Sequence, residues 1–143
     1  MEKLENYISL EKLEVVCNSI EEAHGLPNEC YLEGGYTKFE RKLLFEDKWV
    51  VIGVASNLKQ KGEAVPFNLL GIPLIILKDK NDKIRVFHNV CSHRGYKLLN
   101  EPCKIKNALR CPYHSWAYDL NGKLVSTPHI GGMDKNDADG FVK

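Results

Sequence analysis

Two short segments of similar composition stand out in the chain: Cys91-Ser92-His93-Arg94-Gly95-Tyr96 and Cys111-Pro112-Tyr113-His114-Ser115-Trp116. Each segment offers one thiolate and one imidazole beside a residue that favours a tight turn, Gly95 in the first and Pro112 in the second. Four sulfur and nitrogen donors at this spacing predict a metal site whose ligands come from two short loops.

The pairing of the donors indicates which metal group they hold. A structural zinc site usually takes two Cys from one hairpin and two His from another. Here each loop gives one of each, which suits two chemically distinct irons, with both cysteines on one and both histidines on the other. This is the Rieske 2Fe–2S arrangement. The predicted ligands are Cys91, His93, Cys111 and His114; a zinc-stabilised interaction module is the alternative from another class.

These loops resemble the Rieske domain of non-haem iron ring-hydroxylating oxygenases, the α subunits of aromatic dioxygenases and their relatives of the choline monooxygenase type. The resemblance runs from about Leu26 to Pro128. It departs from the family at Ser115, where the family usually has Gly, and we expect only a change in loop tightness there. The resemblance also implies which neighbours of the ligands tune the cluster: Arg94, Tyr113, Trp116 and Tyr118.

The same resemblance bears on the reduction potential. High-potential Rieske proteins join their loops by a disulfide at the positions of Tyr96 and Tyr113, and place a Ser hydroxyl donor at the position of Trp116. Tyr118 matches a Tyr that donates to a cluster sulfur. Fewer hydrogen-bond donors leave more negative charge on the cluster, so we expect a potential at the low end of the Rieske range.

Composition limits the function classes. A chain of 143 residues with 43% hydrophobic residues fits one soluble domain with a real core. Its net charge of +1 gives no case for nucleic acid or an anionic membrane. The N-terminus lacks the pattern of a secretory signal, and the longest apolar run, residues 69–77, is too short to span a bilayer. The missing secretory signal and the odd number of cysteines, five, together favour a reduced, cytoplasmic setting.

The pattern along the chain predicts a mainly β fold, a small antiparallel barrel or sandwich with two cluster-binding loops, preceded by N-terminal helices. Ser9 can cap a helix over residues 10–24, and Thr37 opens a second over residues 37–45. Asn121-Gly122 predicts a hairpin. Predicted strands cover residues 49–55, 66–70, 73–78, 83–89, 108–111, 117–120 and 123–126. We divide the chain into a helical arm (1–36), a Rieske domain (37–130) and a flexible linker (131–143).

Further histidines and cysteines fall outside this pattern. His24, His88 and His129 are isolated, which favours structural or surface roles. Cys17 lies on the apolar face of the first predicted helix, which favours a place in a core. Cys103 lies between the loops, but four donors already close the site.

We therefore expect one-electron transfer through a Rieske cluster, from a reductase or ferredoxin to the mononuclear iron of a hydroxylating oxygenase. No segment supplies the 2-His-1-carboxylate triad of that iron, so the catalytic domain lies elsewhere, in relatives on a neighbouring subunit of a homotrimer. The chain alone is then an electron-transfer domain rather than a complete oxidoreductase. The alternative within the class is a free-standing Rieske-type ferredoxin.

Overall fold

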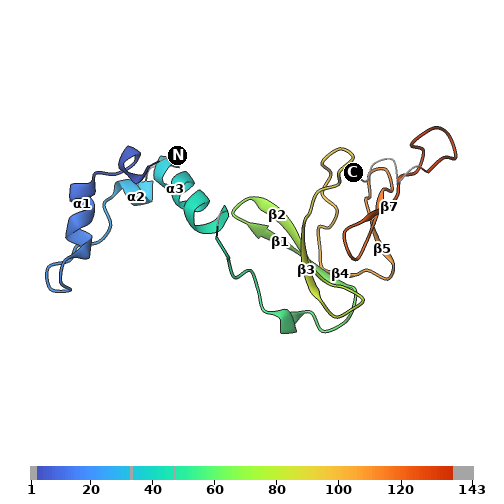
Figure 1. The fold of residues 1–143 in the computed structure, drawn as a ribbon, viewed down its shortest axis with the longest axis horizontal. Helices are drawn as coiled ribbons and strands as arrows, with labels where there is room; N and C mark the ends of the chain where they lie inside the picture. The colour runs from blue at the N-terminus through green and yellow to red at the C-terminus, as the bar shows by residue number, and fades with distance from the viewer. Residues whose placement is uncertain (1–2, 33, 47, 137–143) are drawn as a thin grey trace. The chain divides into compact units, whose positions relative to one another are not determined.

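The computed structural model describes residues 3–32, 34–46 and 48–136, and the chain divides into two compact units, Met1–Val51 and Ile52–Lys143. The first unit holds short helices, and the second holds every strand found in the described ranges (Figure 1). Antiparallel sheets with few helices confirm the predicted mainly β fold. Within the same ranges, no helix has the length and apolar character needed to cross a membrane.

Short helical segments build the N-terminal unit. They are a 3₁₀ turn at Leu4–Asn6, α1 (Leu10–Glu14), a 3₁₀ turn at Val15–Cys17, α2 (Glu29–Leu32), α3 (Gly34–Arg41) and a π-helical turn at Lys42–Glu46. The rings of Tyr7 and Phe39 lie 5.3 Å apart between centroids, so the first turn packs against α3. The second predicted helix, over residues 37–45, is confirmed by α3 and the π-helical turn after it, although α3 begins at Gly34 rather than at Thr37.

The first predicted helix is wrong beyond Cys17. The backbone leaves helical geometry at Asn18, with φ −66° and ψ 175°. The β-branched pair Val15-Val16 loses side-chain freedom in a helix, and Asn18 competes for backbone hydrogen bonds, so the turn ends where both effects meet. Ile20, assigned to the apolar face, is 90% exposed, and the expected core position of Cys17 is exposed as well.

Two antiparallel sheets form the second unit. The first has the order β3-β2-β1-β4, from β1 (Glu63–Leu69), β2 (Ile72–Lys78), β3 (Ile84–His88) and β4 (Cys103–Lys104). The second has the order β5-β6-β7, from β5 (Ala108–Arg110), β6 (Ala117–Asp119) and β7 (Leu124–Ser126). All but β4 match predicted strands to within a few residues. The strand β4, which pairs with β1 at Cys103 and Ala64, was not predicted because its two residues are too few to show an alternating pattern.

The strand predicted over residues 49–55 is wrong. Residues 49–54, all of them described, carry no regular secondary structure, and Ala55–Asn57 forms a 3₁₀ turn. The side chains of Trp49 and Val51 are almost completely exposed, at 104% and 92%. Aromatic and β-branched residues favour a strand only where they pack on a pleated surface, so propensity alone misleads here.

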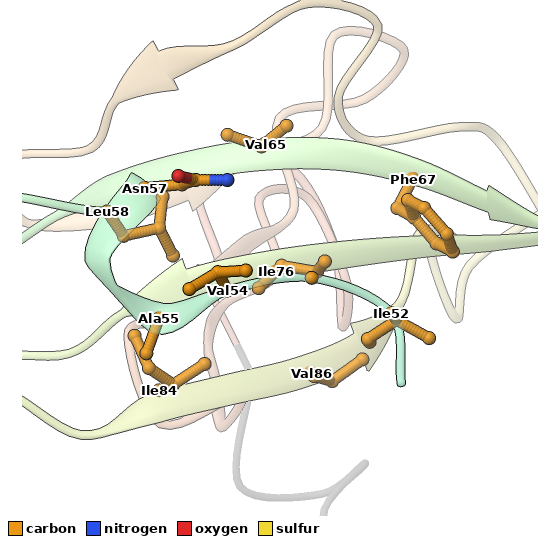
Figure 2. Close-up of a pocket in the computed structure, with 11 residues that line it drawn as sticks. Ile52, Val54, Ala55, Asn57, Leu58, Val65, Phe67, Ile76, Ile84 and Val86 are labelled. Atoms are coloured by element: carbon orange, nitrogen blue, oxygen red, sulfur yellow. The ribbon is translucent and has the colours of Figure 1, made fainter. Parts of the chain in front are cut away.

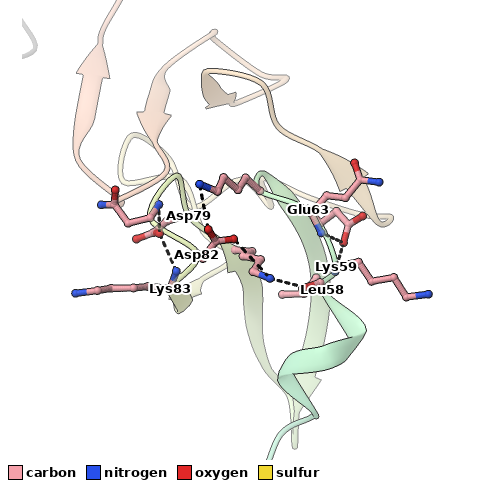
Figure 3. Close-up of polar contacts among 10 residues, drawn as sticks. Leu58, Lys59, Glu63, Asp79, Asp82 and Lys83 are labelled. Atoms are coloured by element: carbon pink, nitrogen blue, oxygen red, sulfur yellow. Dashed lines mark hydrogen bonds and ion pairs between the residues drawn. The ribbon is translucent and has the colours of Figure 1, made fainter.

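The turns β2–β3 and β6–β7 share one construction. The Oδ1 atom of Asp79 accepts hydrogen bonds from the backbone N–H groups of Asn81 and Lys83, at 2.7 and 3.0 Å (Figure 3). Asp119 accepts the two equivalent bonds at 2.8 and 2.9 Å. The left-handed position is Asp82 in the first turn (φ 63°) and Gly122 in the second (φ 86°). The hairpin predicted at Asn121-Gly122 is confirmed.

One core cluster joins the two sheets. Its buried members on β1 and β2 are Ala64, Ile75 and Leu77, and Leu120 joins them from the β6–β7 turn. Leu99, between β3 and β4, and Ile105, in the connection from β4 to the second sheet, complete it. The segments that carry the two ligand loops are therefore anchored on a common core.

The opposite face of the first sheet is also apolar. Val65 on β1, Ile76 on β2 and Val86 on β3 line it, and they alternate with the core residues along each strand. The segment around Val54 and Leu58 lies over them and encloses a hollow of about 330 Å³ (Figure 2). Two apolar faces explain why β2 reads as a nearly continuous apolar run.

Candidate functional site

The two predicted ligand loops close with the same backbone hydrogen bonds. In the first loop, the N–H of Cys91 donates to the carbonyl of Tyr96 (2.8 Å), and the N–H of Gly95 donates to the backbone carbonyl of Cys91 (2.9 Å). In the second, the N–H of Cys111 donates to the carbonyl of Trp116 (2.7 Å) and the N–H of Ser115 donates back to Cys111 (3.0 Å). Each Cys therefore lies at the base of a tight turn, just after β3 in one case and β5 in the other.

A left-handed residue makes each turn possible. Gly95 has φ 68° and Ser115 has φ 60°. A side chain is strained in this region, which explains why the related family has Gly at the second position. The closing distances of the two loops are nevertheless alike, and the change in loop tightness expected at Ser115 relative to the family stays a prediction.

Burial separates the two kinds of donor. Cys91 and Cys111 are 1% and 2% exposed, in a cluster with Trp116 and Leu124. His93 is half-buried and His114 is exposed, and their rings lie 4.8 Å apart between centroids. The sulfur atoms are thus withdrawn from water, whereas an imidazole edge remains accessible.

The protonation state of His93 suits a metal ligand. Burial of the ring, followed by the positive charges of His114 and Arg94, lowers the pKa of His93 below its ordinary value. An imidazole must be neutral to bind a metal. Arg94, which is exposed, thereby contributes electrostatically even though it is not itself a candidate ligand.

Tyr118 reaches the first loop from β6. Its hydroxyl oxygen lies 3.3 Å from Sγ of Cys91, accepts the N–H of Ser92 at 3.0 Å, and lies 2.9 Å from the Ser92 hydroxyl. Burial raises the pKa of Tyr118, so the phenol stays protonated and can donate to sulfur. The Tyr118 hydroxyl thus lies within hydrogen-bonding distance of the Cys91 sulfur, and its role as a donor to the cluster stays a prediction.

Aromatic rings lie where a disulfide would join the loops in high-potential relatives. Tyr96 and Tyr113 face each other with centroids 5.6 Å apart, and Tyr113 also lies 3.8 Å from the ring of His114. All five cysteines, each of them in the described ranges, are free thiols. Ring contacts rather than a covalent bond therefore connect the loop tips.

A hollow of about 500 Å³ opens at the histidine edge. Both imidazoles, Arg94 and Trp116 line it, together with His129 and its neighbours from the segment after β7. The segment is held by Asn136, whose Oδ1 accepts the N–H of Thr127 at 2.6 Å. In the sequence His129 is an isolated histidine, because nothing nearby indicates that its segment returns to the ligand loops.

The chemistry of the four donors fits a Rieske cluster. Such a cluster asks each of its two irons for only two protein ligands, thiolates on one iron and imidazoles on the other. Two buried thiols and two neighbouring imidazoles meet that requirement.

Comparison with known families agrees with this chemistry. A family model described as the Rieske [2Fe-2S] domain matches residues 48–136. The chain belongs to the Rieske domain family. A Rieske domain carries a 2Fe–2S cluster, so the zinc-module alternative is wrong.

The relatives of this Rieske domain are oxygenase subunits. The carnitine monooxygenase oxygenase subunit of Acinetobacter baumannii is 31% identical over 134 residues, which cover 91% of this chain and 36% of that protein. A solved quaternary ammonium Rieske monooxygenase, described for carnitine oxidation by gut microbiota and inter-subunit electron transfer, is 30% identical with a TM-score of 0.69, covering 78% of this chain and 32% of the other.

A naphthalene 1,2-dioxygenase from Rhodococcus sp. has a similar fold, with 27% identity and a TM-score of 0.71, covering 82% of this chain and 26% of the other. The chain spans about a third or less of the length of the proteins it matches. It is thus a Rieske domain of the oxygenase α-subunit type, and its family is consistent with electron transfer.

Proposed function

We propose that this domain passes single electrons from a reductase or ferredoxin to the mononuclear iron of a hydroxylating oxygenase. Cys91 and Cys111 hold one iron of the cluster, and His93 and His114 hold the other. The observation that carries this assignment is the pair of loops closed by the same hydrogen bonds, with two thiols in one buried cluster and two imidazoles 4.8 Å apart between ring centroids. When bound, the cluster supplies a one-electron couple.

The surroundings of each ligand suit that role. Burial of Cys91 and Cys111 keeps water from the sulfur atoms and leaves the histidine edge as the shortest route for an electron. The ring of Trp116 fixes the orientation of His93 by stacking on it. Arg94 and Tyr113 flank the same edge, where a protein partner would make contact.

The electron acceptor is proposed to lie in a catalytic domain, on a neighbouring subunit of a homotrimer. Support comes from the relatives, which are longer oxygenase subunits, one of them described in connection with inter-subunit electron transfer. In this proposal residues 1–36 are an arm, residues 37–130 the Rieske domain and residues 131–143 a linker. The last part of that linker, residues 137–143, lies outside the described residues. Relatives with different substrates share the domain, so the electron route is their common chemistry.

Reconstitution with iron and sulfide tests the assignment. Cys91→Ser and Cys111→Ser should lose the cluster, measured as bound iron, bound sulfide and the electron paramagnetic resonance signal after reduction. Cys103→Ser, a matched control in β4, should keep all three. Full cluster content in either ligand variant would refute the ligand assignment, and a colourless wild-type chain holding zinc would refute the function.

A further inference from the structure

Asn89 is a completely buried polar residue that lies two positions before the first ligand cysteine. Its Oδ1 atom accepts the backbone N–H groups of Leu98 and Leu99, at 2.9 and 2.8 Å, and its Nδ2 donates to the carbonyl of Leu99 at 2.6 Å. Its own backbone N–H donates to the carbonyl of Pro73 on β2 at 2.8 Å. The side chain therefore ties the segment that enters the first loop to the segment that leaves it.

The second loop is closed differently. Its two legs belong to β5 and β6, which pair directly at Arg110 and Ala117, and the Arg110 guanidinium also donates to the carbonyl of Ser115 at 3.1 Å. The first loop has no such ladder, because β3 pairs with β2 and the described residues 97–100 lie in no strand. The carboxamide of Asn89 takes the place of the missing strand pairing.

The leg that Asn89 holds packs on the buried cluster that includes the ligand cysteines. Leu98 contacts both the core between the sheets and the cluster of buried residues that contains Cys91 and Cys111. Tyr118 then reaches the same loop from the other sheet, through Cys91 and Ser92. The first loop is thus fixed at its base by Asn89 and near its ligand by Tyr118.

We propose that Asn89 is a positioning residue: it keeps the first ligand loop closed so that the Tyr118 hydroxyl stays within reach of the Cys91 sulfur. The inference rests on the proposed function, because the ligand role of Cys91 belongs to it. A hydrogen bond to a ligand sulfur stabilises the more negative, reduced cluster, so its loss lowers the midpoint potential. Asn89 therefore acts on the potential through Tyr118.

The test compares Asn89→Ala with Asn68→Ala on the reconstituted chain. Asn68 also accepts a backbone N–H, that of Gly71 at 2.6 Å, but in the β1–β2 turn. Asn89→Ala should lower the midpoint in the same direction as Tyr118→Phe and should release iron to a chelator about tenfold faster, the ratio that corresponds to 1.4 kcal/mol. Asn68→Ala should change neither quantity.

The double variant separates positioning from general stability. With Tyr118→Phe already present, Asn89→Ala should produce no further shift of the midpoint, because the bond it acts through is gone. A full shift in that background, or a wild-type midpoint in Asn89→Ala, would overturn the proposal.

Amide hydrogen exchange of the wild-type chain gives a readout that needs no variant. The N–H groups of Leu98 and Leu99 should exchange slowly, since each donates to a buried carboxamide. Exchange at the rate of open amides would overturn the role of Asn89 even if Asn89→Ala failed to fold. A wild-type chain that takes up no iron–sulfur cluster would instead refute the proposed function, and amide exchange would then judge Asn89 by itself.

Discussion

The indole ring of Trp116 stacks on the imidazole of His93, with centroids 4.6 Å apart and planes 13° from parallel. Trp116 is 3% exposed and belongs to the second loop, whereas His93 is half-buried and belongs to the first. The contact therefore joins the two loops through a proposed ligand and the buried ring that stacks on it.

Removing this ring should destabilise the domain strongly. Trp116→Ala should lower the free energy of unfolding by about 3–5 kcal/mol, since a buried aromatic side chain is lost. Chemical denaturation of the cluster-loaded chain measures this free energy of unfolding. The chain offers a matched control, because Trp49 is fully exposed and Trp49→Ala should stay within about 0.5 kcal/mol of wild type. Equal effects of the two substitutions would contradict the burial of Trp116.

The Tyr118 hydroxyl should raise the midpoint potential. Tyr118→Phe removes a donor 3.3 Å from Sγ of Cys91, a loss of about 1 kcal/mol, which for one electron is roughly 40 mV. With Tyr118 intact and no loop disulfide, the wild-type midpoint should lie near the lower bound of the range of about −150 to +300 mV. Voltammetry measures both values. Tyr96→Phe, which keeps its ring contact with Tyr113, is the control, and a wild-type midpoint well above zero would refute the argument.

Substitution of the left-handed residues of the two loops should change the stability of the domain in opposite directions. Ser115→Gly should stabilise the domain by about 1 kcal/mol, because glycine adopts φ 60° without strain. Gly95→Ser should cost a similar amount. An added Cβ at Gly95 meets no atom within 4 Å, so backbone strain alone sets the cost. Thermal unfolding measures both, and a stabilising Gly95→Ser would contradict this reading.

The β2–β3 turn should make stability depend on pH. Hydrogen bonding from Arg85, at 2.7 Å, and from the backbone of Lys83 and Asn81 lowers the pKa of Asp79, partly offset by burial. The stabilisation is therefore complete above the unfolded pKa of about 3.9 and is lost as pH falls through the lower folded pKa.

Urea denaturation of wild type and Asp79→Asn from pH 7 to pH 2 checks this dependence. The variant cannot ionise at this position, so the difference in unfolding free energy should be largest near neutrality and should shrink in acid. Glu63, whose pKa is also lowered by backbone hydrogen bonds, is present in both proteins, and its contribution cancels. A difference that is constant over the whole range would show that the ionisation of Asp79 is not the cause.

The ligand loops, most strands and the class of the site could be predicted from the amino-acid sequence. Cys91-Ser92-His93 and Cys111-Pro112-Tyr113-His114 determine these because ligand chemistry and loop closure are local: donor type, spacing and a turn residue lie within six positions. The turn at Asn121-Gly122 is local in the same sense, since Asp119 and its hydrogen-bonding partners are at most four residues apart.

The residues that lie against those loops are known from the folded structure and could not be predicted. Asn89 reads as an ordinary residue after a strand, and its role appears only when Leu98 and Leu99 return to it. His129 reaches the histidine edge for the same reason. Propensity failed in residues 18–24 and 49–55 because a helix or strand persists only where packing supplies the free energy that local preference lacks. Contacts between residues distant in sequence leave no periodic pattern, so these parts of the site could not be read from the chain alone.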